Sequence, residues 1–231
     1  MARVSVIVPT LNERENLLPL LQGIGKELPG AEVIVVDDDS PDRTWELAER
    51  ARRQYPGLRV IRRRGKRGLS SAVLRGFDAG RGQVLVCMDA DLSHDPRLLP
   101  DLVSWIRQGG DLAVGSRRVR GGGSSSWPLH RKLTSDAATW LAARLLQVPL
   151  ADPLSGYFAV DAAFYRRIRR RLDPRGYKVL LEIAVRGQPE CVREFPFTFR
   201  TRKAGHSKLS LTVMLQLVQM LLALRRFQKR R

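Results

Sequence analysis

The chain has 231 residues, enough for one α/β domain with additions, and its apolar fraction of 43% can fill a sizeable core. Its two cysteines, Cys87 and Cys191, stand in no paired pattern, which disfavours a disulfide framework or a zinc site and favours a reducing, cytoplasmic compartment. The 41 Lys and Arg residues outnumber the 23 Asp and Glu residues, and this excess favours a polyanionic partner, either nucleic acid or an anionic membrane surface. We see no secretory signal before the first predicted strand and no apolar run long enough to span a bilayer.

The first half of the chain alternates short apolar strands with helices. Strands are predicted at residues 3–8, 32–36, 58–61, 84–88 and 112–115, and helices at 15–28, 43–54, 69–79 and 96–107. This alternation is typical of βαβ units, so we expect an α/β fold with a mostly parallel sheet and helices on both of its faces.

Polar side chains follow four of these strands. The apolar run at 84–88 leads directly into Asp89-Ala90-Asp91, and ligands of open α/β sheets bind outside the carboxyl ends of the strands. Two carboxylates one residue apart suit a hard divalent cation that also contacts a diphosphate, although Asp and Ser before a helix are also ordinary capping residues. For Asp95, which precedes Pro96, we expect capping. Four polar strand ends together favour one ligand cleft over four unrelated caps.

The second half is less regular. Residues 120–126 are rich in Gly and Ser and predict a flexible loop that could act as a lid. We expect helices at 129–146, 162–170 and 179–185, a turn at 152–156, and strands at 157–160 and 192–201.

The apolar stretch at 209–224 carries one narrow polar stripe, formed by Thr212, Gln216, Gln219 and Ala223, and a basic tail follows it. A helix of this length spans about 24 Å, too short to cross a bilayer. Two interpretations stay open. The helix could dock on the core or in a dimer interface, or it could lie in a membrane surface as an amphipathic interfacial helix, and the basic tail favours the second.

Four motifs in order resemble the inverting nucleotide-sugar glycosyltransferases of family 2, which have the Rossmann-like GT-A fold: PTLNE at 9–13, VDDDSPD at 36–42, DADLSH at 89–94 and GSR at 115–117. Residues 68–72, 152–157 and 205–209 further resemble dolichyl- or polyprenyl-phosphate mannosyltransferases. The resemblance implies a GT-A domain at 1–208, with the amphipathic helix and basic tail at 209–231.

This resemblance implies an enzyme that moves mannose, with inversion, from GDP-mannose to a polyprenyl monophosphate with the help of Mg²⁺ or Mn²⁺. The implied catalytic residues are Asp91, Arg117 and Arg131, of which the two arginines would face the acceptor phosphate. The implied donor pocket consists of Pro9, Leu11, Glu13, Val36, Asp38, Asp89, Ala90, Asp91, Arg117, Arg202 and Lys208. Within it, Asp89 and Asp91 would hold the metal, with Ser93 a possible further ligand, and Arg202 and Lys208 would lie in a loop that closes over the donor. At three positions the chain departs from the family pattern: Leu11 replaces a frequent Tyr, Ser93 replaces a Gln, and His206 replaces an acidic residue.

A phosphate acceptor is already an oxyanion and needs no general base, whereas a hydroxyl acceptor does. Three alternatives stay open. The donor could be UDP-glucose or another nucleotide sugar. The acceptor could be a hydroxyl, with Asp152 as the only obvious base, although its Pro-containing turn favours a structural role. Nucleic-acid binding is disfavoured because no recognition motif is present and the aromatic residues are sparse. We expect peripheral contact with the cytoplasmic face of an anionic membrane, or a membrane-protein partner, because a polyprenyl tail stays in lipid.

Overall fold

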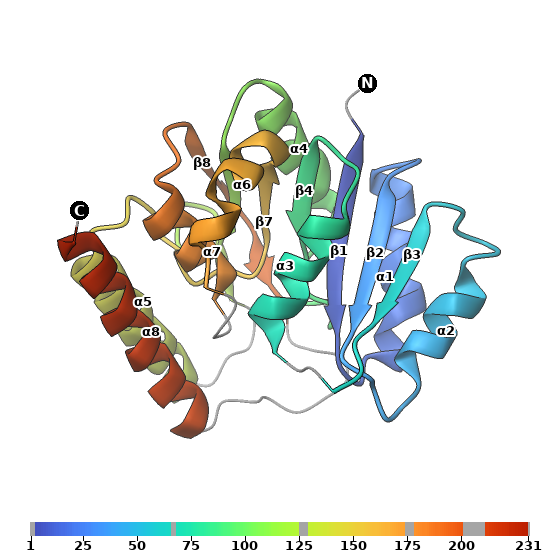
Figure 1. Ribbon diagram of the computed structural model, residues 1–231, viewed down its shortest axis with the longest axis horizontal. Helices are drawn as coiled ribbons and strands as arrows, with labels where there is room; N and C mark the ends of the chain where they lie inside the picture. The colour runs from blue at the N-terminus through green and yellow to red at the C-terminus, as the bar shows by residue number, and fades with distance from the viewer. Residues whose placement is uncertain (1–2, 66–67, 125–128, 174–177, 201–210, 231) are drawn as a thin grey trace.

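The computed structural model describes residues 3–65, 68–124, 129–173, 178–200 and 211–230, which form a central sheet with helices on both faces (Figure 1). The sheet strands are β1 (Val4–Thr10), β2 (Glu32–Asp37), β3 (Leu58–Arg62), β4 (Val84–Cys87), β5 (Leu112–Ser116), β7 (Phe158–Asp161) and β8 (Val192–Pro196). Two short strands, β6 (Gly123–Ser124) and β9 (Thr198–Phe199), pair separately. The helices are α1 (Arg14–Glu27), α2 (Thr44–Ala51), α3 (Leu69–Ala79), α4 (Leu99–Arg107), α5 (Leu129–Leu146), α6 (Ala162–Ile168), α7 (Val179–Glu182) and α8 (Leu211–Lys229).

The seven strands of the main sheet lie in the order β3-β2-β1-β4-β7-β5-β8. Only β7 is antiparallel, and it lies between β4 and β5. The predicted mostly parallel α/β sheet is therefore confirmed. Because β7 runs in the opposite direction, its amino-terminal end meets the carboxyl ends of the other strands at one edge.

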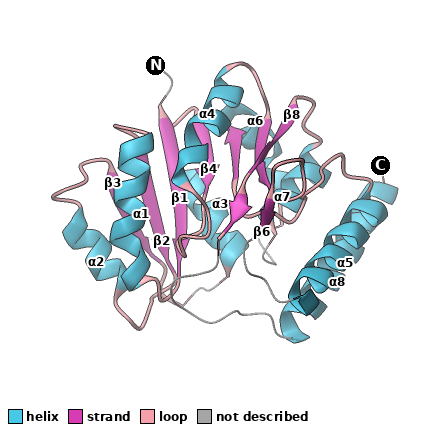
Figure 2. Cartoon of the chain, turned by 180° about the vertical axis from the view of Figure 1, so that it is seen from behind, coloured by secondary structure: helices cyan, strands magenta, loops and turns pink. Residues whose placement is uncertain are grey.

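Two apolar layers cover the sheet. On one face α3, α6 and α7 pack over side chains such as Ile7 and Ile34 (Figure 1). On the other face α1, α2 and α4 pack over side chains such as Val6 and Val35, as the view from behind shows (Figure 2). Alternating residues of β1 and β2 thus point into different layers, as expected for strands buried on both sides.

The structure corrects the predicted loop at 120–126. Residues 123 and 124 form β6, which pairs in parallel with β9, and the Gly123 amide donates to the Phe197 carbonyl at 3.1 Å. A strand of two residues has no periodicity, and its partner is 75 positions away, so the local sequence could not reveal it. Residues 125 and 126 lie outside the described part of the chain.

Two further predicted elements are divided in the structure. The helix expected at 179–185 is the short α7, which continues as a π-helical turn at Ile183–Gly187. The late strand expected at 192–201 divides at Phe197 into β8 and β9.

The helix α8 docks on the protein along one side. Leu217, Met220, Leu221 and Leu224 belong to the larger apolar core, where α8 packs against α5 and the π-helical turn. The two helices lie side by side at one end of the sheet in both ribbon views (Figures 1 and 2). At their carboxyl ends, the Gln228 side-chain amide donates to the Leu146 carbonyl at 2.7 Å and so caps α5.

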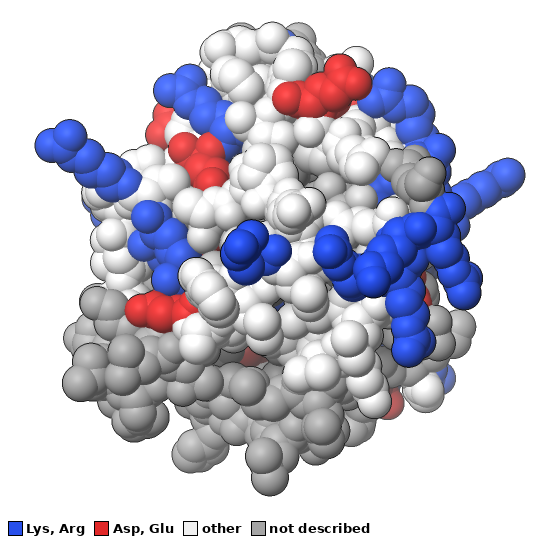
Figure 3. Space-filling view, turned by 90° about the vertical axis from the view of Figure 1, so that its left-hand side faces the viewer, with Lys and Arg blue, Asp and Glu red and all other residues white. Residues whose placement is uncertain are grey.

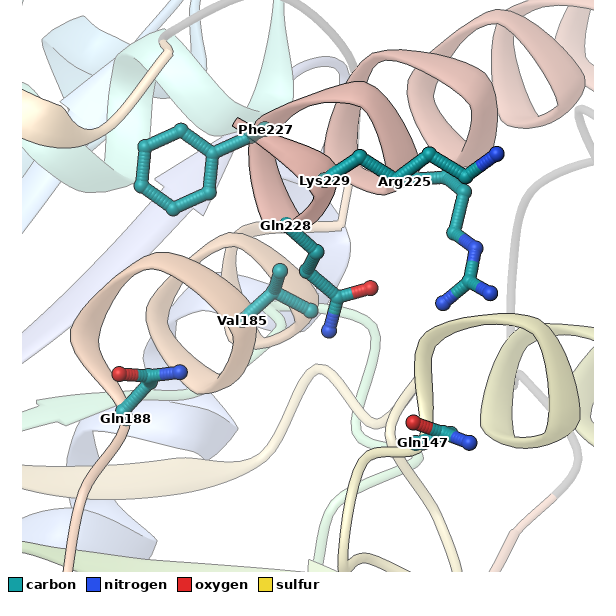
Figure 4. A pocket seen from close by; sticks show the side chains of 7 residues that line it. All are labelled: Gln147, Val185, Gln188, Arg225, Phe227, Gln228 and Lys229. Atoms are coloured by element: carbon teal, nitrogen blue, oxygen red, sulfur yellow. The ribbon is translucent and has the colours of Figure 1, made fainter. Parts of the chain in front are cut away.

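A cavity of about 260 Å³ lies at this junction, with Gln147, Val185 and Arg225 among its lining side chains (Figure 4). The cavity belongs to the seam between α5, the π-helical turn and α8. Its lining contains none of the side chains predicted to bind the donor or the acceptor.

Candidate active site

The carboxyl ends of β1, β2 and β4 meet at one edge of the sheet, which is the lower edge in Figure 1. The strand register places Pro9 beside Val36, and Ile7 beside Cys87, two residues before Asp89. Pro9, Val36 and Asp89 therefore lie at the same level of three adjacent strands.

A backbone with positive φ follows each of these three strands, at Asn12 (60°), Asp39 (57°) and Leu92 (61°). Residues other than glycine rarely adopt this conformation, and such strained positions cluster at ligand sites. The turns after β1 and β2 are hydrogen-bonded to each other, because the Asn12 amide donates to the Ser40 hydroxyl at 3.0 Å. The Glu13 amide likewise donates to the Thr44 hydroxyl at 3.0 Å.

The consecutive carboxylates after β2 have different surroundings. Asp37 is fully buried and accepts hydrogen bonds from Thr10 and Ser40, so it builds the turn. Asp38, the predicted donor residue, accepts from the Arg63 guanidinium at 2.6 Å and from the Gly68 amide at 2.8 Å. The local sequence gives Arg63 no visible role, since its partner is 25 positions away.

Asp89 and Asp91 stand at the end of β4 in unlike environments. The Asp91 carboxylate is 3% exposed and accepts hydrogen bonds from both the amide and the hydroxyl of Ser93. The Asp89 side chain is 29% exposed, and its backbone amide donates to Nδ1 of His94 at 3.1 Å. Asp95 caps the turn that follows, as predicted, because its carboxylate accepts from the Arg97 amide.

His94 is a structural neighbour of the carboxylates that sequence analysis did not single out. It is buried and stacks on Tyr157, with ring centroids 4.8 Å apart and an interplanar angle of 11°. Burial lowers the pKa of His94, although the charges of Asp89 and Asp91 oppose this effect. The neutral ring accepts from the Asp89 amide and thereby holds the turn that carries both carboxylates.

The donor set of this turn fits a hard divalent cation. Among the described residues, no cluster of three or more His, Cys, Asp or Glu side chains could hold a metal. Asp89, Asp91 and the Ser93 hydroxyl offer oxygen atoms only, and Mg²⁺ commonly binds one or two carboxylates and completes its shell with substrate phosphate and water. Residue 156 is a glycine, and this leaves space beside Asp89. A side chain at this position would place its Cβ atom only 3.0 Å from Asp89 Oδ2.

Arg117 follows β5 and forms a buried ion pair with Asp152. Its Nε and one terminal nitrogen each donate to the carboxylate at 2.7 Å, and its backbone amide donates at 3.1 Å. Lys178 lies on the same side of the site and donates to the Leu154 carbonyl at 2.8 Å. Arg117 was predicted as a site residue, whereas no motif in the sequence points to Lys178.

The structure describes some of the other predicted site residues fully, one only by its backbone, and three not at all. Pro9, Val36 and Ala90 are buried, and Leu11 and Glu13 are partly buried beside them. Arg131 lies in α5, but its side chain is not described. Arg202, His206 and Lys208 lie outside the described residues. The chain reaches residue 200 beside the carboxylates, where the Arg200 amide donates to the Ser93 carbonyl at 3.1 Å.

None of the helices in the described ranges is both long and apolar enough to cross a membrane.

Comparisons with known proteins identify the family of this chain. Residues 5–172 match the family model described as glycosyl transferase family 2. A dolichol-phosphate mannosyltransferase of Pyrococcus furiosus is 47% identical over 90% of this chain, which spans only 59% of that protein's length. A dolichol-phosphate mannosyltransferase of Saccharomyces cerevisiae is 37% identical over 94% of this chain and 85% of its own length.

A solved structure confirms the fold. The glucosyl-3-phosphoglycerate synthase of Mycobacterium tuberculosis, crystallised with Mn²⁺, UDP-glucose and phosphoglyceric acid, superposes with a TM-score of 0.69. The match covers 97% of this chain and 80% of the synthase, at 22% identity. The superposition shows the GT-A fold, and the family model and the mannosyltransferase relatives show that this chain belongs to glycosyl transferase family 2.

Proposed function

We propose that this chain transfers mannose from GDP-mannose to a polyprenyl monophosphate, with inversion at the anomeric carbon and with a divalent metal. One observation carries the proposal: a pair of carboxylates, Asp89 and Asp91, and a partly buried guanidinium, that of Arg117, lie at one edge of the sheet. The turn that contains Asp152 and Gly156 contacts both. Similarity to dolichol-phosphate mannosyltransferases supports mannose as the transferred sugar and a polyprenyl phosphate as the acceptor.

In the proposed donor site, Asp89 and Asp91 hold Mg²⁺ or Mn²⁺, with Ser93 as a possible third ligand. The bound metal would neutralise the charge that develops on the leaving nucleoside diphosphate. The nucleotide would lie along the ends of β1, β2 and β4, against Pro9, Leu11, Glu13, Val36, Asp38 and Ala90. Arg202 and Lys208 would approach the diphosphate from the segment that follows residue 200.

In the proposed acceptor site, Arg117 and Arg131 hold the lipid phosphate. A phosphate oxygen forms the new bond to the anomeric carbon while the bond from that carbon to the diphosphate oxygen breaks, so GDP leaves with both electrons. The acceptor is ionised at neutral pH and no proton has to be removed. The planar guanidinium suits this task because it binds phosphate oxygens in pairs.

The environment of Asp152 supports a phosphate acceptor over a hydroxyl acceptor. A hydroxyl would need a base, and Asp152 was the only obvious candidate. Burial raises the pKa of Asp152, but the hydrogen bonds and charge of Arg117 outweigh this effect and leave the pKa below its ordinary value. A carboxylate that is fully buried and bonded through both oxygens to an arginine is a weak base.

UDP-glucose is a second candidate for the donor. The Mycobacterium tuberculosis synthase binds UDP-glucose on the same fold, so a polyprenyl-phosphate transferase that uses UDP-glucose, or another nucleotide sugar, is the alternative to test.

We also propose that the end of the molecule formed by α5 and α8 contacts the cytoplasmic face of an anionic membrane, where the lipid tail of the acceptor stays. Trp140 and Leu141 on α5 and Val218 and Leu222 on α8 are exposed. Lys and Arg side chains spread across the middle of this face, beside uncharged surface (Figure 3). In this proposal residues 1–208 form the GT-A domain and residues 209–231 add the amphipathic helix, alone or together with a membrane-protein partner.

A panel of donors and acceptors tests the proposed reaction. Purified protein would receive radiolabelled GDP-mannose or UDP-glucose, a polyprenyl phosphate in detergent, and Mg²⁺, Mn²⁺ or EDTA. We expect organic-phase label with GDP-mannose and a metal, and none with EDTA. Absence of lipid-linked product with every donor would refute the proposal, and product with UDP-glucose alone would select the alternative.

The matched variant in this panel is Asp91→Asn, which keeps the shape and an acceptor oxygen for the Ser93 amide. We expect turnover to fall by at least a hundredfold while the far-ultraviolet circular dichroism stays unchanged. Near-normal turnover would remove Asp91 from the metal site.

A further inference from the structure

The ion pair between Arg117 and Asp152 is one of the most enclosed in the described part of the molecule. The Arg117 side chain is 15% exposed and the Asp152 side chain is fully buried. The carboxylate bonds side-on to Nε and one terminal nitrogen of the guanidinium and also accepts from the Arg117 amide. Three hydrogen bonds between two residues fix the side chain of Arg117 relative to its own backbone.

Asp152 is itself held from two strands. The amides of Ala151 and Asp152 donate to the two oxygens of the Glu194 carboxylate on β8, at 2.6 and 3.0 Å. On the other side of the turn, the Ser155 hydroxyl donates to the Gly115 carbonyl on β5 at 2.7 Å. The carboxylate therefore occupies a fixed place between two neighbouring strands of the sheet.

The side-on pair also orients the guanidinium. Because Asp152 occupies the edge formed by Nε and one terminal nitrogen, the other terminal nitrogen points away from the carboxylate. The guanidinium carbon lies 5.7 Å from the centre of the Phe199 ring, which packs on the same cluster as His94. Gly156, four residues after Asp152 in the same turn, approaches Asp89 Oδ2 closely. One turn thus contacts both the proposed acceptor arginine and the proposed metal carboxylate.

We propose that Asp152 is a positioning residue, which holds Arg117 in line with the anomeric carbon of the donor, and that the turn at 152–156 sets the span between acceptor and metal. The inference rests on the proposed function, since it takes the ligand of Arg117 to be the acceptor phosphate. The charges indicate which property Asp152 affects. Its negative carboxylate weakens the attraction of Arg117 for an anion, so Asp152 contributes to the alignment of the acceptor phosphate and not to its affinity.

The test is the kinetics of Asp152→Asn with GDP-mannose and polyprenyl phosphate. The amide keeps the size of the side chain and removes its charge. We expect kcat to fall at least tenfold, KM for the acceptor to stay equal or decrease, and KM for the donor to stay unchanged. A purely structural role would lower the folded fraction without changing either constant per folded molecule. A kcat within twofold of the wild type would overturn the proposal, and so would an increased acceptor KM at unchanged kcat.

Arg117→Lys supplies the second arm, because an ammonium group cannot form the side-on pair. If Asp152 acts through Arg117, adding Asp152→Asn to Arg117→Lys should change kcat by less than threefold. Losses that multiply in the double variant would overturn the proposal.

The matched control is Asp78→Asn. Asp78 forms a more exposed two-point pair with Arg169, at 2.7 and 2.8 Å, at the end of α3 remote from Gly68. We expect this variant to keep kcat and both KM values, and an equal loss there would assign the effect to general destabilisation and overturn the proposal.

If Asp152→Asn does not fold, Glu194→Gln tests the same inference, because it loosens the turn and leaves the pair chemically intact. The expected change is a smaller decrease in kcat without an increase in acceptor KM, and unchanged kcat would overturn the proposal. The proposed function fails separately, when the wild-type protein forms no lipid-linked product with any donor.

Discussion

Lys178 is a partly buried lysine of the site, and its pKa is lowered. Its ammonium group donates to the Leu154 carbonyl. Burial and the charge of Arg117 lower its pKa from the ordinary 10.5 to about 8, although Asp89 and Asp152 oppose the shift. Between these two values the unfolded lysine keeps a proton that the folded lysine has lost.

This difference predicts how stability depends on pH. Stability rises with pH wherever the unfolded state binds more protons, so the free-energy cost of burying the charged lysine should disappear progressively between about pH 8 and about pH 10.5. We expect the free energy of unfolding of the wild type, relative to Lys178→Met, to rise by on the order of 3 kcal/mol across that window. Urea titrations at several pH values measure it, and parallel pH curves for the two proteins would contradict the expected shift.

The site residues could be predicted from the sequence, whereas the residues that hold them by hydrogen bonds are distant in the sequence and could not. Asp38, Asp89, Asp91 and Arg117 could be singled out because each follows a strand whose apolar run is visible in the sequence. The residues that hold them could not. Asp152 is 35 positions from Arg117, and Glu194 is 42 positions from Asp152, so only the antiparallel β7 and the parallel β8 bring them together.

At the scale of single elements, the contact between α3 and β1 shows how tightly the layers pack. A Cβ atom at Gly76 would lie 2.4 Å from a methyl group of Ile7. Such a contact can be relieved only by shifting the helix or the Ile7 side chain, and overpacking of this kind costs roughly 1–3 kcal/mol.

We therefore expect Gly76→Ala to lower the free energy of unfolding by roughly 1–3 kcal/mol, less a gain of up to about 1 kcal/mol from helix propensity. The matched control is Gly25→Ala in α1, where the nearest atom to a Cβ is 4.0 Å away. There the change should stabilise the protein by about 0.5–1 kcal/mol. Urea denaturation compares the two, and equal shifts would contradict the packing argument.

The elements themselves were largely predictable where periodicity is strong. The ranges expected for α3 and α5 match the observed ones, and the ranges of the first five strands agree within two residues at each end. The π-helical turn, the short β6 and the reversed direction of β7 were not predictable. A π-turn changes one hydrogen-bond step, a two-residue strand has no pattern, and strand direction depends on connections that apolar runs do not encode.

For the whole molecule, the exposed apolar side chains of α5 and α8 predict lipid binding. Trp140 is 66% exposed and Leu222 is 50% exposed. Transfer of such side chains into lipid contributes roughly 1.5–3 kcal/mol each, so Trp140→Ser with Leu222→Ser should weaken binding to anionic vesicles by at least about a hundredfold. Leu18→Ser, at an exposed position of α1 on another side of the molecule, is the control and should keep wild-type binding. Vesicle flotation measures the bound fraction, and unchanged flotation of the double variant would contradict a membrane role for this face.

The pairing of Arg117 with Asp152 also has an architectural consequence. It joins the two ends of an excursion of the chain, residues 118–151, which includes β6 and α5. With both ends fixed to each other, the base of the excursion stays closed whatever the length of the connecting turns within it, and doubling a flexible turn costs only about 0.6 kcal/mol in closure entropy. The body of the excursion is not free to change, because α5 carries Arg131 of the proposed acceptor site and packs Leu146 into the core. The connecting turns are therefore where evolution or design could alter the surface of this end of the molecule without altering the distances at the reaction centre.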